Sequence, residues 1–124
     1  MKIEKVLYFG NPYIQEDNLV IKIIEKLDKI PNIKFFYVKN VFQLVDMDFK
    51  NTVILDVADN IKKTILLGTK DIKKIKRTTA HDFDLGFFLR LTKQKVKIIA
   101  IPKEYDENKA IEEVTKLLEN NIES

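Results

Sequence analysis

The sequence predicts an α/β fold: a three-layer domain with a mostly parallel, twisted sheet of about five strands and helices on both faces. Two observations carry this prediction. Apolar, β-prone segments alternate along the chain with segments whose apolar residues recur at helical spacing. The segment 52–55 is apolar throughout, which is typical of a strand buried on both faces of a parallel sheet. Strands that alternate with helices form βαβ units, whose crossovers make the strands parallel.

The N-terminal half supplies the first strands and the first helix. A strand is expected over residues 3–9, where the breaker Gly10-Asn11-Pro12 follows it. A helix is expected over 19–30, a second strand over 33–38, and a helical turn over 41–45. The inward face of the helix is predicted from its apolar residues, which are Leu19, Val20, Ile23, Ile24, Leu27 and Ile30.

The C-terminal half repeats the alternation. Strands are expected over 52–55, ending at Asp56, over 64–67 and over 96–101. Helices are expected over 83–92 and 110–118. Because no linker, repeat or low-complexity stretch interrupts this pattern, we expect one domain over residues 1–124.

Composition narrows the class of protein. Hydrophobic residues make up 45% of the chain, which is enough for a core, and charged residues make up 33%. No apolar run approaches the roughly 20 residues of a membrane span, and the N-terminus does not resemble a signal peptide. We therefore expect a soluble, cytoplasmic protein with no membrane partner.

The charged and sulfur-containing residues exclude several chemistries. The chain has no cysteine, so disulfides, thiolate metal sites and cysteine nucleophiles are excluded. The net charge is only +3, from 22 basic and 19 acidic residues that are well mixed. The one basic cluster, 70–77, carries apolar residues at helical spacing, so it is interpreted as a solvated lysine face. Nucleic acid is not expected as a partner and stays a distant alternative.

Polar residues follow the predicted strands where ligands usually bind. In open parallel sheets that place is beyond the carboxyl ends of the strands. The first strand leads to Gly10-Asn11 and then to Glu16-Asp17, and the third ends at Asp56. The only histidine, His81, precedes the helix predicted over 83–92. Two carboxylates and one imidazole would suit a divalent ion such as nickel or zinc.

Each of these residues also has a structural interpretation. Asp17 stands just before a helix, where aspartate is a preferred N-cap. Asp56 at a strand end could order the following turn, and His81 could cap a helix or lie on the surface. Taken singly, the structural interpretation is favoured for every one of them.

Four segments together resemble the endopeptidases that mature the large subunit of nickel–iron hydrogenases. That family begins with a G-x-G-N motif and an acidic pair; this chain has 8–11, reading YFGN, and Glu16-Asp17. A hydrophobic strand that ends in D-A-V-D is matched by 53–59, reading VILDVAD. The pattern H-x-x-x-L-x-x-x-L is matched from His81, and the segment 98–102 is similar to the family's late strand ending in proline.

The resemblance implies a function and a site. Carried over by position, the metal ligands are Asp17, Asp56 and His81, and the substrate-binding residues are Gly10, Asn11 and Glu16, with no catalytic residue assigned. The implied metal is nickel, bound by the protein or supplied by the substrate, with zinc or another divalent ion as a substitute. The implied activity is removal of a C-terminal extension from a nickel-loaded hydrogenase large-subunit precursor. His81 near a helix N-terminus should stay neutral, as metal binding requires.

The chain departs from the family at a few positions, and these departures motivate an alternative. Tyr8 stands in place of the first glycine, and Asn18 and Val20 replace small residues after the acidic pair. The alternative is a non-catalytic relative with the same fold that binds a metal or a partner. A third interpretation, an unrelated α/β domain, predicts that Asp17, Asp56 and His81 lie apart. The chain has no phosphate-binding glycine loop, and its only serine is Ser124, so nucleotide chemistry and serine catalysis are not expected.

Overall fold

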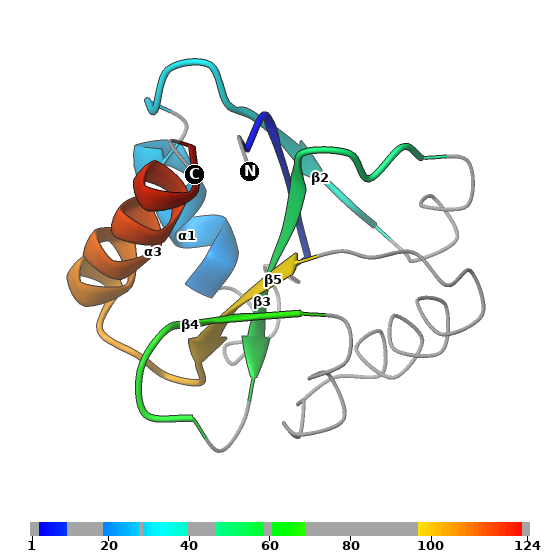
Figure 1. The fold of residues 1–124 in the computed structure, drawn as a ribbon. Helices are drawn as coiled ribbons and strands as arrows, with labels where there is room; N and C mark the ends of the chain where they lie inside the picture. The colour runs from blue at the N-terminus through cyan, green and yellow to red at the C-terminus, as the bar shows by residue number, and fades with distance from the viewer. Residues whose placement is uncertain are drawn as a thin grey trace.

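The computed structural model has a five-stranded, mostly parallel sheet with helices packed against it (Figure 1). It describes residues 3–9, 19–27, 29–39, 47–58, 61–68 and 97–122. The strand order is β2-β1-β3-β5-β4, in which only the β4–β5 pair is antiparallel. The predicted α/β fold is therefore confirmed. The described elements are β1 (Lys5–Tyr8), α1 (Leu19–Leu27), β2 (Lys34–Tyr37), β3 (Thr52–Ala58), β4 (Ile65–Leu67), β5 (Lys97–Pro102) and α3 (Glu107–Ile122).

Strand β3 lies at the centre of the sheet and is buried along its whole length. It pairs with β1 from Lys5↔Thr52 to Tyr8↔Leu55, and with β5 from Val53↔Lys97 to Ala58↔Pro102. A strand buried on both faces has no solvent-facing side, so its sequence is apolar without alternation. This confirms the interpretation of the VIL run.

Both described helices pack on the same face of the sheet, side by side (Figure 1). Helix α1 buries one stripe, because its apolar residues recur every three or four positions. Val20 and Ile23 are 0% exposed there, against Val53 and Leu55 of β3. Helix α3 adds Ala110, Val114 and Leu118 to the same core.

The opposite face of the sheet carries a second buried cluster. Successive residues of a strand point to opposite faces, so Leu7, Ile54 and Ile98 lie on the far side from α1 and α3. Phe9, Val38 and Phe49 are buried with them. The sheet thus buries apolar side chains on both faces. The helix expected over 83–92, which would test whether helices cover both faces, lies outside the described residues.

Some helices and strands begin or end at other residues than predicted, because contacts other than apolar burial set those ends. Strand β3 does not end at Asp56 but continues to Ala58, because Asp56 and the two residues after it pair with β5. Helix α1 ends at Leu27, and the chain turns through Lys29 and Ile30 to Asn32, whose φ is 66°. Helix α3 begins at Glu107, earlier than the expected residue 110.

The early start of α3 has a local cause. The Lys109 N–H donates to Asp106 Oδ2 at 2.8 Å, so Asp106 acts as the N-cap. The Ala110 N–H donates to the Asp106 carbonyl at 2.9 Å, which closes the first turn. The first turn of the helix is largely exposed, so hydrophobic spacing alone predicts a helix start that is too late.

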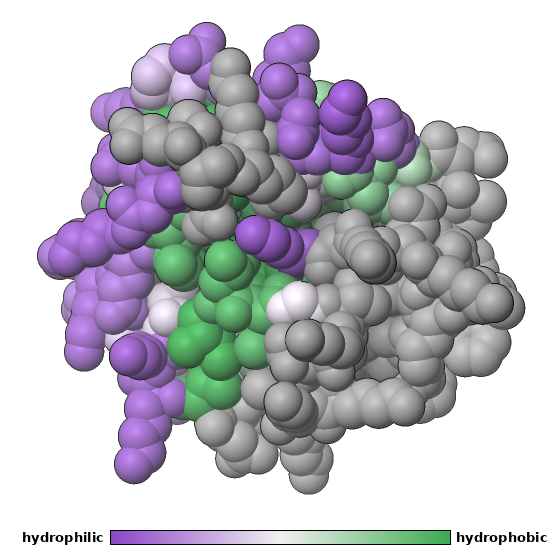
Figure 2. All heavy atoms as spheres, in the orientation of Figure 1, coloured by the Kyte–Doolittle hydropathy of each residue, from purple (hydrophilic) through white to green (hydrophobic). Residues whose placement is uncertain are grey.

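The surface around the helices is hydrophilic, whereas an apolar area lies over the edge strand β4 (Figure 2). The three residues of β4, Ile65, Leu66 and Leu67, are each half-buried. Neither of the helices that the structure describes is long and apolar enough to cross a membrane.

The packing of α1 on β3 predicts a large difference between two isoleucines of one helix. Ile23→Ala removes a side chain that is 0% exposed, so the free energy of unfolding should fall by about 2–5 kcal/mol. Ile21→Ala is the control, because Ile21, two residues earlier in the same helix, is only half-buried. Urea denaturation should show a clearly larger loss for Ile23→Ala; equal losses would contradict the described helix face.

Candidate functional site

The sheet has a topological switch point between β1 and β3. From β1 the chain passes through α1 to β2 on one side, and later enters β3 on the other side of β1. Where the connections leave a point of the sheet in opposite directions, α/β proteins usually bind ligands beyond the carboxyl ends of the two strands. In the sequence, the segment 10–17 follows β1, and Asp56 lies near the carboxyl end of β3.

Asp56 is a buried acid in an apolar strand. Its exposed fraction is 2%. The neighbouring residues Leu55 and Val57 belong to the core under the helices, so Asp56 between them points to the other face of the sheet. Its register partner on β5 is Ala100, whose methyl side chain is small. Burying a carboxyl group is costly unless it is hydrogen-bonded or paired, so its place in the strand needs a physical reason.

One reason is the backbone of its own strand. Leu55 is the last residue of β3 in register with β1, and its carbonyl accepts the Phe9 N–H at 3.4 Å. By the alternation of a parallel ladder, the Val57 N–H points to the same side, beyond the end of β1. Asp56 Oδ1 accepts that N–H at 2.8 Å. The carboxylate therefore satisfies a buried backbone donor and is itself held in one orientation.

Two departures from the family pattern lie away from Asp56. Tyr8 packs against the core under the helices, and its ring centroid is 5.5 Å from that of Tyr37. It thus lies on the face of the sheet opposite to the Asp56 side chain. Val20 is 0% exposed in the core beneath α1. Both bulkier residues fill the core and do not fill the space next to the buried acid.

The remaining predicted site residues lie outside the described residues; these are Gly10, Asn11, Glu16, Asp17 and His81. Asn18, the third departure from the family pattern, lies outside them as well. Within the described ranges, no three histidine or acidic side chains come together as a metal site would require. The set Asp17, Asp56 and His81 therefore stays a prediction.

A second polar cluster, which the sequence patterns did not indicate, lies near the end of β5. Tyr105 Oη donates to Glu113 Oε1 at 2.7 Å, and the Thr64 N–H donates to the same oxygen at 3.2 Å. Lys109 Nζ lies 5.3 Å from the centre of the Tyr105 ring. The cluster ties the loop after β5, helix α3 and the entry to β4 together. Tyr105 and Glu113 are only eight positions apart in the sequence, whereas Thr64 is 49 positions from Glu113. The sequence patterns therefore do not indicate the contact with Thr64.

The cluster shifts two pKa values in opposite directions. Partial burial, together with the hydrogen bond to Glu113, raises the pKa of Tyr105 to about 12. Burial acts against ionisation of Glu113, but the hydrogen bonds from Tyr105 and Thr64 outweigh it and lower the pKa of Glu113. The Thr64 hydroxyl contributes to this lowering, although it is buried without a hydrogen bond of good geometry. The arrangement favours a neutral tyrosine that donates to an ionised glutamate.

Comparison with known proteins identified no relative of this chain. The chain matches no protein-family model, no curated protein and no solved structure.

The hydrogen bond from Val57 predicts how Asp56 variants behave. Asp56→Ala leaves a buried N–H without its acceptor and should lower the free energy of unfolding by about 1–3 kcal/mol. Asp56→Asn keeps an oxygen acceptor, so it should lower the free energy of unfolding clearly less than Asp56→Ala does. Asp48→Ala is the matched control, because Asp48 Oδ1 accepts the Lys50 N–H at 3.0 Å on an exposed segment. Denaturation that ranks Asp48→Ala as the most damaging change would contradict this role of Asp56.

The Tyr105–Glu113 pair predicts a pH dependence of stability at both ends of the scale. The lowered pKa of Glu113 contributes stability that is present above its ordinary value of 4.5 and is lost as the pH falls through the lowered value. The raised pKa of Tyr105 contributes stability below its ordinary value of 10.0, lost as the pH rises toward about 12. Glu113→Gln should remove the acid-side dependence and Tyr105→Phe the alkaline-side dependence, as measured by urea denaturation across the pH range.

The control for this pair is Glu112→Gln on the same helix. Glu112 is exposed and pairs with Lys116 at 3.1 Å, and such surface pairs contribute little. Its stability profile against pH should stay close to that of the unchanged protein. A Glu113→Gln profile that is equally unchanged would show that the cluster does not hold the ionised form.

Proposed function

We propose that this protein is a metal-dependent endopeptidase that removes a C-terminal extension from a nickel-loaded hydrogenase large-subunit precursor. The proposal rests first on the resemblance of four segments, from 8–11 to 98–102, to the hydrogenase maturation endopeptidases. The single structural observation that supports it is the place of Asp56. A buried acid stands near the carboxyl end of β3, at the switch point between β1 and β3.

The position of Asp56 suits a metal ligand. The segment that contains Glu16 and Asp17 follows β1, the strand next to β3. The Val57 N–H holds the Asp56 carboxylate at 2.8 Å, and such outer partners usually orient metal-ligating carboxylates. Asp17 and His81 would complete a set of two carboxylates and one imidazole, which fits nickel or zinc.

The proposed chemistry follows from three protein ligands and open coordination positions. A bound divalent ion would polarise the scissile carbonyl or lower the pKa of a bound water. Where nickel arrives with the precursor, the same three side chains would dock that ion and make cleavage depend on nickel insertion. Gly10, Asn11 and Glu16, on the segment after β1, would contact the substrate in either case.

The positions of two residues that depart from the family pattern support the protease over the non-catalytic alternative. Tyr8 and Val20 motivated that alternative, because bulky residues could narrow the site. Both side chains pack in the core on the helix side of the sheet, away from the Asp56 side chain. The argument for a lost activity is therefore weaker at these two positions.

Precursor cleavage is the decisive test of this function. A nickel-loaded large-subunit precursor should be cut at one C-terminal bond by the unchanged protein, and a nickel-free precursor should not. Asp17→Ala, Asp56→Asn and His81→Ala should each lower the cleavage rate by about a hundredfold or more, because outer and inner metal groups typically matter on that scale. Mass spectrometry of the product identifies the bond.

The controls separate loss of function from loss of fold. Asp48→Asn removes a charge from an exposed aspartate on the opposite edge of the sheet and should cleave normally. Calorimetric titration with nickel shows whether the free protein holds the ion. Binding of the loaded precursor without any cleavage would overturn the protease and support the partner-binding relative.

A further inference from the structure

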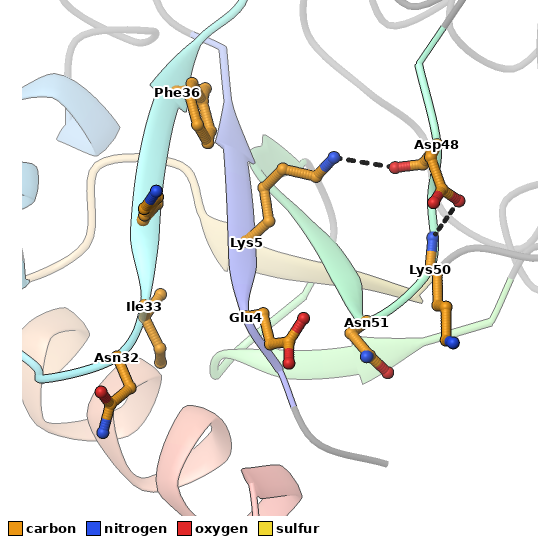
Figure 3. A pocket seen from close by; sticks show the side chains of 9 residues that line it. Glu4, Lys5, Asn32, Ile33, Phe36, Asp48, Lys50 and Asn51 are labelled. Carbon is orange, nitrogen blue, oxygen red and sulfur yellow. Dashed lines mark hydrogen bonds between the residues drawn. The ribbon is translucent and has the colours of Figure 1, made fainter.

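A cavity lies at the amino ends of the strands, at the end of the sheet opposite to the candidate metal site. It has a volume of about 820 Å³ and opens beside the amino ends of β1, β2 and β3 (Figure 3). Lys5 comes from β1 and Phe36 from β2, whereas Asp48, Lys50 and Asn51 come from the segment that leads into β3 (Figure 3). A cavity of this size lies within the usual range for small-molecule sites.

Three lysines gather around this cavity. Lys5 and Lys34 are register partners on the neighbouring strands β1 and β2. Val6 and Phe35 pack toward the helices, so Lys5 and Lys34 both point to the other face. Neighbouring strands are about 4.8 Å apart, so the two lysines start from adjacent positions on the face that carries the cavity.

Two of the three ammonium groups are available to a ligand. Lys5 Nζ donates to the Asp48 carbonyl at 2.8 Å, so it holds the 48–51 segment against β1 (Figure 3). Lys34 and Lys50 are exposed, and neither has an ion pair with any residue in the described ranges. Two acids, Glu4 and Asp48, line the same cavity, so the three lysines leave its lining with a net charge of +1.

An aromatic ring completes the cavity beside the lysines. Phe36 is 42% exposed, which makes it one of two large hydrophobic side chains that are exposed among the described residues. Its position two residues after Lys34 in β2 places both side chains on the same face of the sheet. A half-exposed ring next to cationic groups is the arrangement that a flat, anionic ligand would use, with its ring stacked on the aromatic side chain.

The amide and acid groups of the lining add hydrogen-bonding capacity. The Asn51 carbonyl accepts the Glu4 and Lys5 N–H groups at 2.9 and 3.3 Å, which fixes this residue at a φ of 54°. Its side-chain amide and the Glu4 carboxylate both line the cavity (Figure 3). Together they offer donors and acceptors to the polar edge of a heterocyclic ring.

We propose that this cavity binds a small organic phosphate that carries a flat ring, of the nucleoside monophosphate class. The phosphate would lie between Lys34 and Lys50, since lysine binds phosphate as a point charge. The ring would stack on Phe36. This binding needs no glycine-rich phosphate loop, because side-chain ammonium groups take the place of backbone N–H donors. The site is at the opposite edge of the sheet from Asp56, so it does not depend on the proposed protease activity.

The test is calorimetric titration of the whole chain with adenosine monophosphate at low salt. We expect saturable binding with a dissociation constant below about 1 mM. Inorganic phosphate, which lacks the ring, and adenosine, which lacks the phosphate, should each bind at least about tenfold more weakly. Lys34→Gln and Lys50→Gln should each weaken binding of the nucleotide about fivefold or more.

Matched variants separate the site from general attraction between charges. Lys22→Gln removes the same charge from an exposed position on α1, on the other face of the sheet, and should leave the affinity within about twofold. Phe36→Leu keeps an apolar side chain without the flat ring. It should weaken binding of the nucleotide but not binding of inorganic phosphate. All variants are checked for unchanged urea midpoints.

Three results would overturn the proposal. These are no saturation by adenosine monophosphate up to about 10 mM, equal affinity for inorganic phosphate and the nucleotide, or an equal loss in Lys22→Gln and Lys34→Gln. Because none of these titrations involves a metal or a precursor, failure of the protease assay leaves them unaffected.

Discussion

The burial of β3 on both faces is the constraint on which the rest of the structure depends. This strand contributes to the core under α1 and α3 through Leu55 and Val57, and to the core on the other face through Ile54. It also pairs with β1 and β5 at once. A residue of such a strand meets apolar neighbours in every direction, so a polar side chain is tolerated only where hydrogen bonds replace water. Asp56 is one of few buried polar residues among those described, and it is bonded to the Val57 N–H.

The parallel arrangement gives the two edges of the sheet different properties. At the carboxyl edge, β1 ends at Tyr8 while β3 continues to Ala58, so a buried backbone donor and an acid are brought together next to the switch point. At the amino edge, Lys5 and Lys34 are placed side by side by the register of β1 and β2. At the amino ends the strand pairing sets which groups meet, because Lys5 and Lys34 are far apart in the sequence. At the carboxyl ends the pairing acts differently: β1 stops short of Val57, and the adjacent Asp56 supplies the acceptor for its N–H.

The antiparallel edge strand is held by polar as well as apolar contacts. Strand β4 has only three residues and is half-buried, so it has little core of its own. The Thr64 N–H just before it donates to Glu113 of α3, which also accepts from Tyr105 after β5. Hydrogen bonds to an ionised group are stronger than those between neutral groups. The hydrogen bonds that lower the pKa of Glu113 therefore also tie the β4 end of the sheet to the C-terminal helix.

Much of the fold follows from the sequence, because hydrophobic spacing reports burial directly. The stripe of α1 follows from helical spacing and β3 from its apolar run, and their residues are buried as expected except Ile30, which lies beyond the helix end and is half-buried. The end of β3 beyond Asp56 and the start of α3 at Glu107 were not, since pairing with β5 and the Asp106 cap decide them. Of the candidate metal site, the residue types and the place of Asp56 near the carboxyl end of its strand followed from the sequence. Only the tertiary structure could place Tyr8 on the opposite face of the sheet and bring Glu113 to Thr64, because strand pairing and helix packing join residues that are far apart in the sequence.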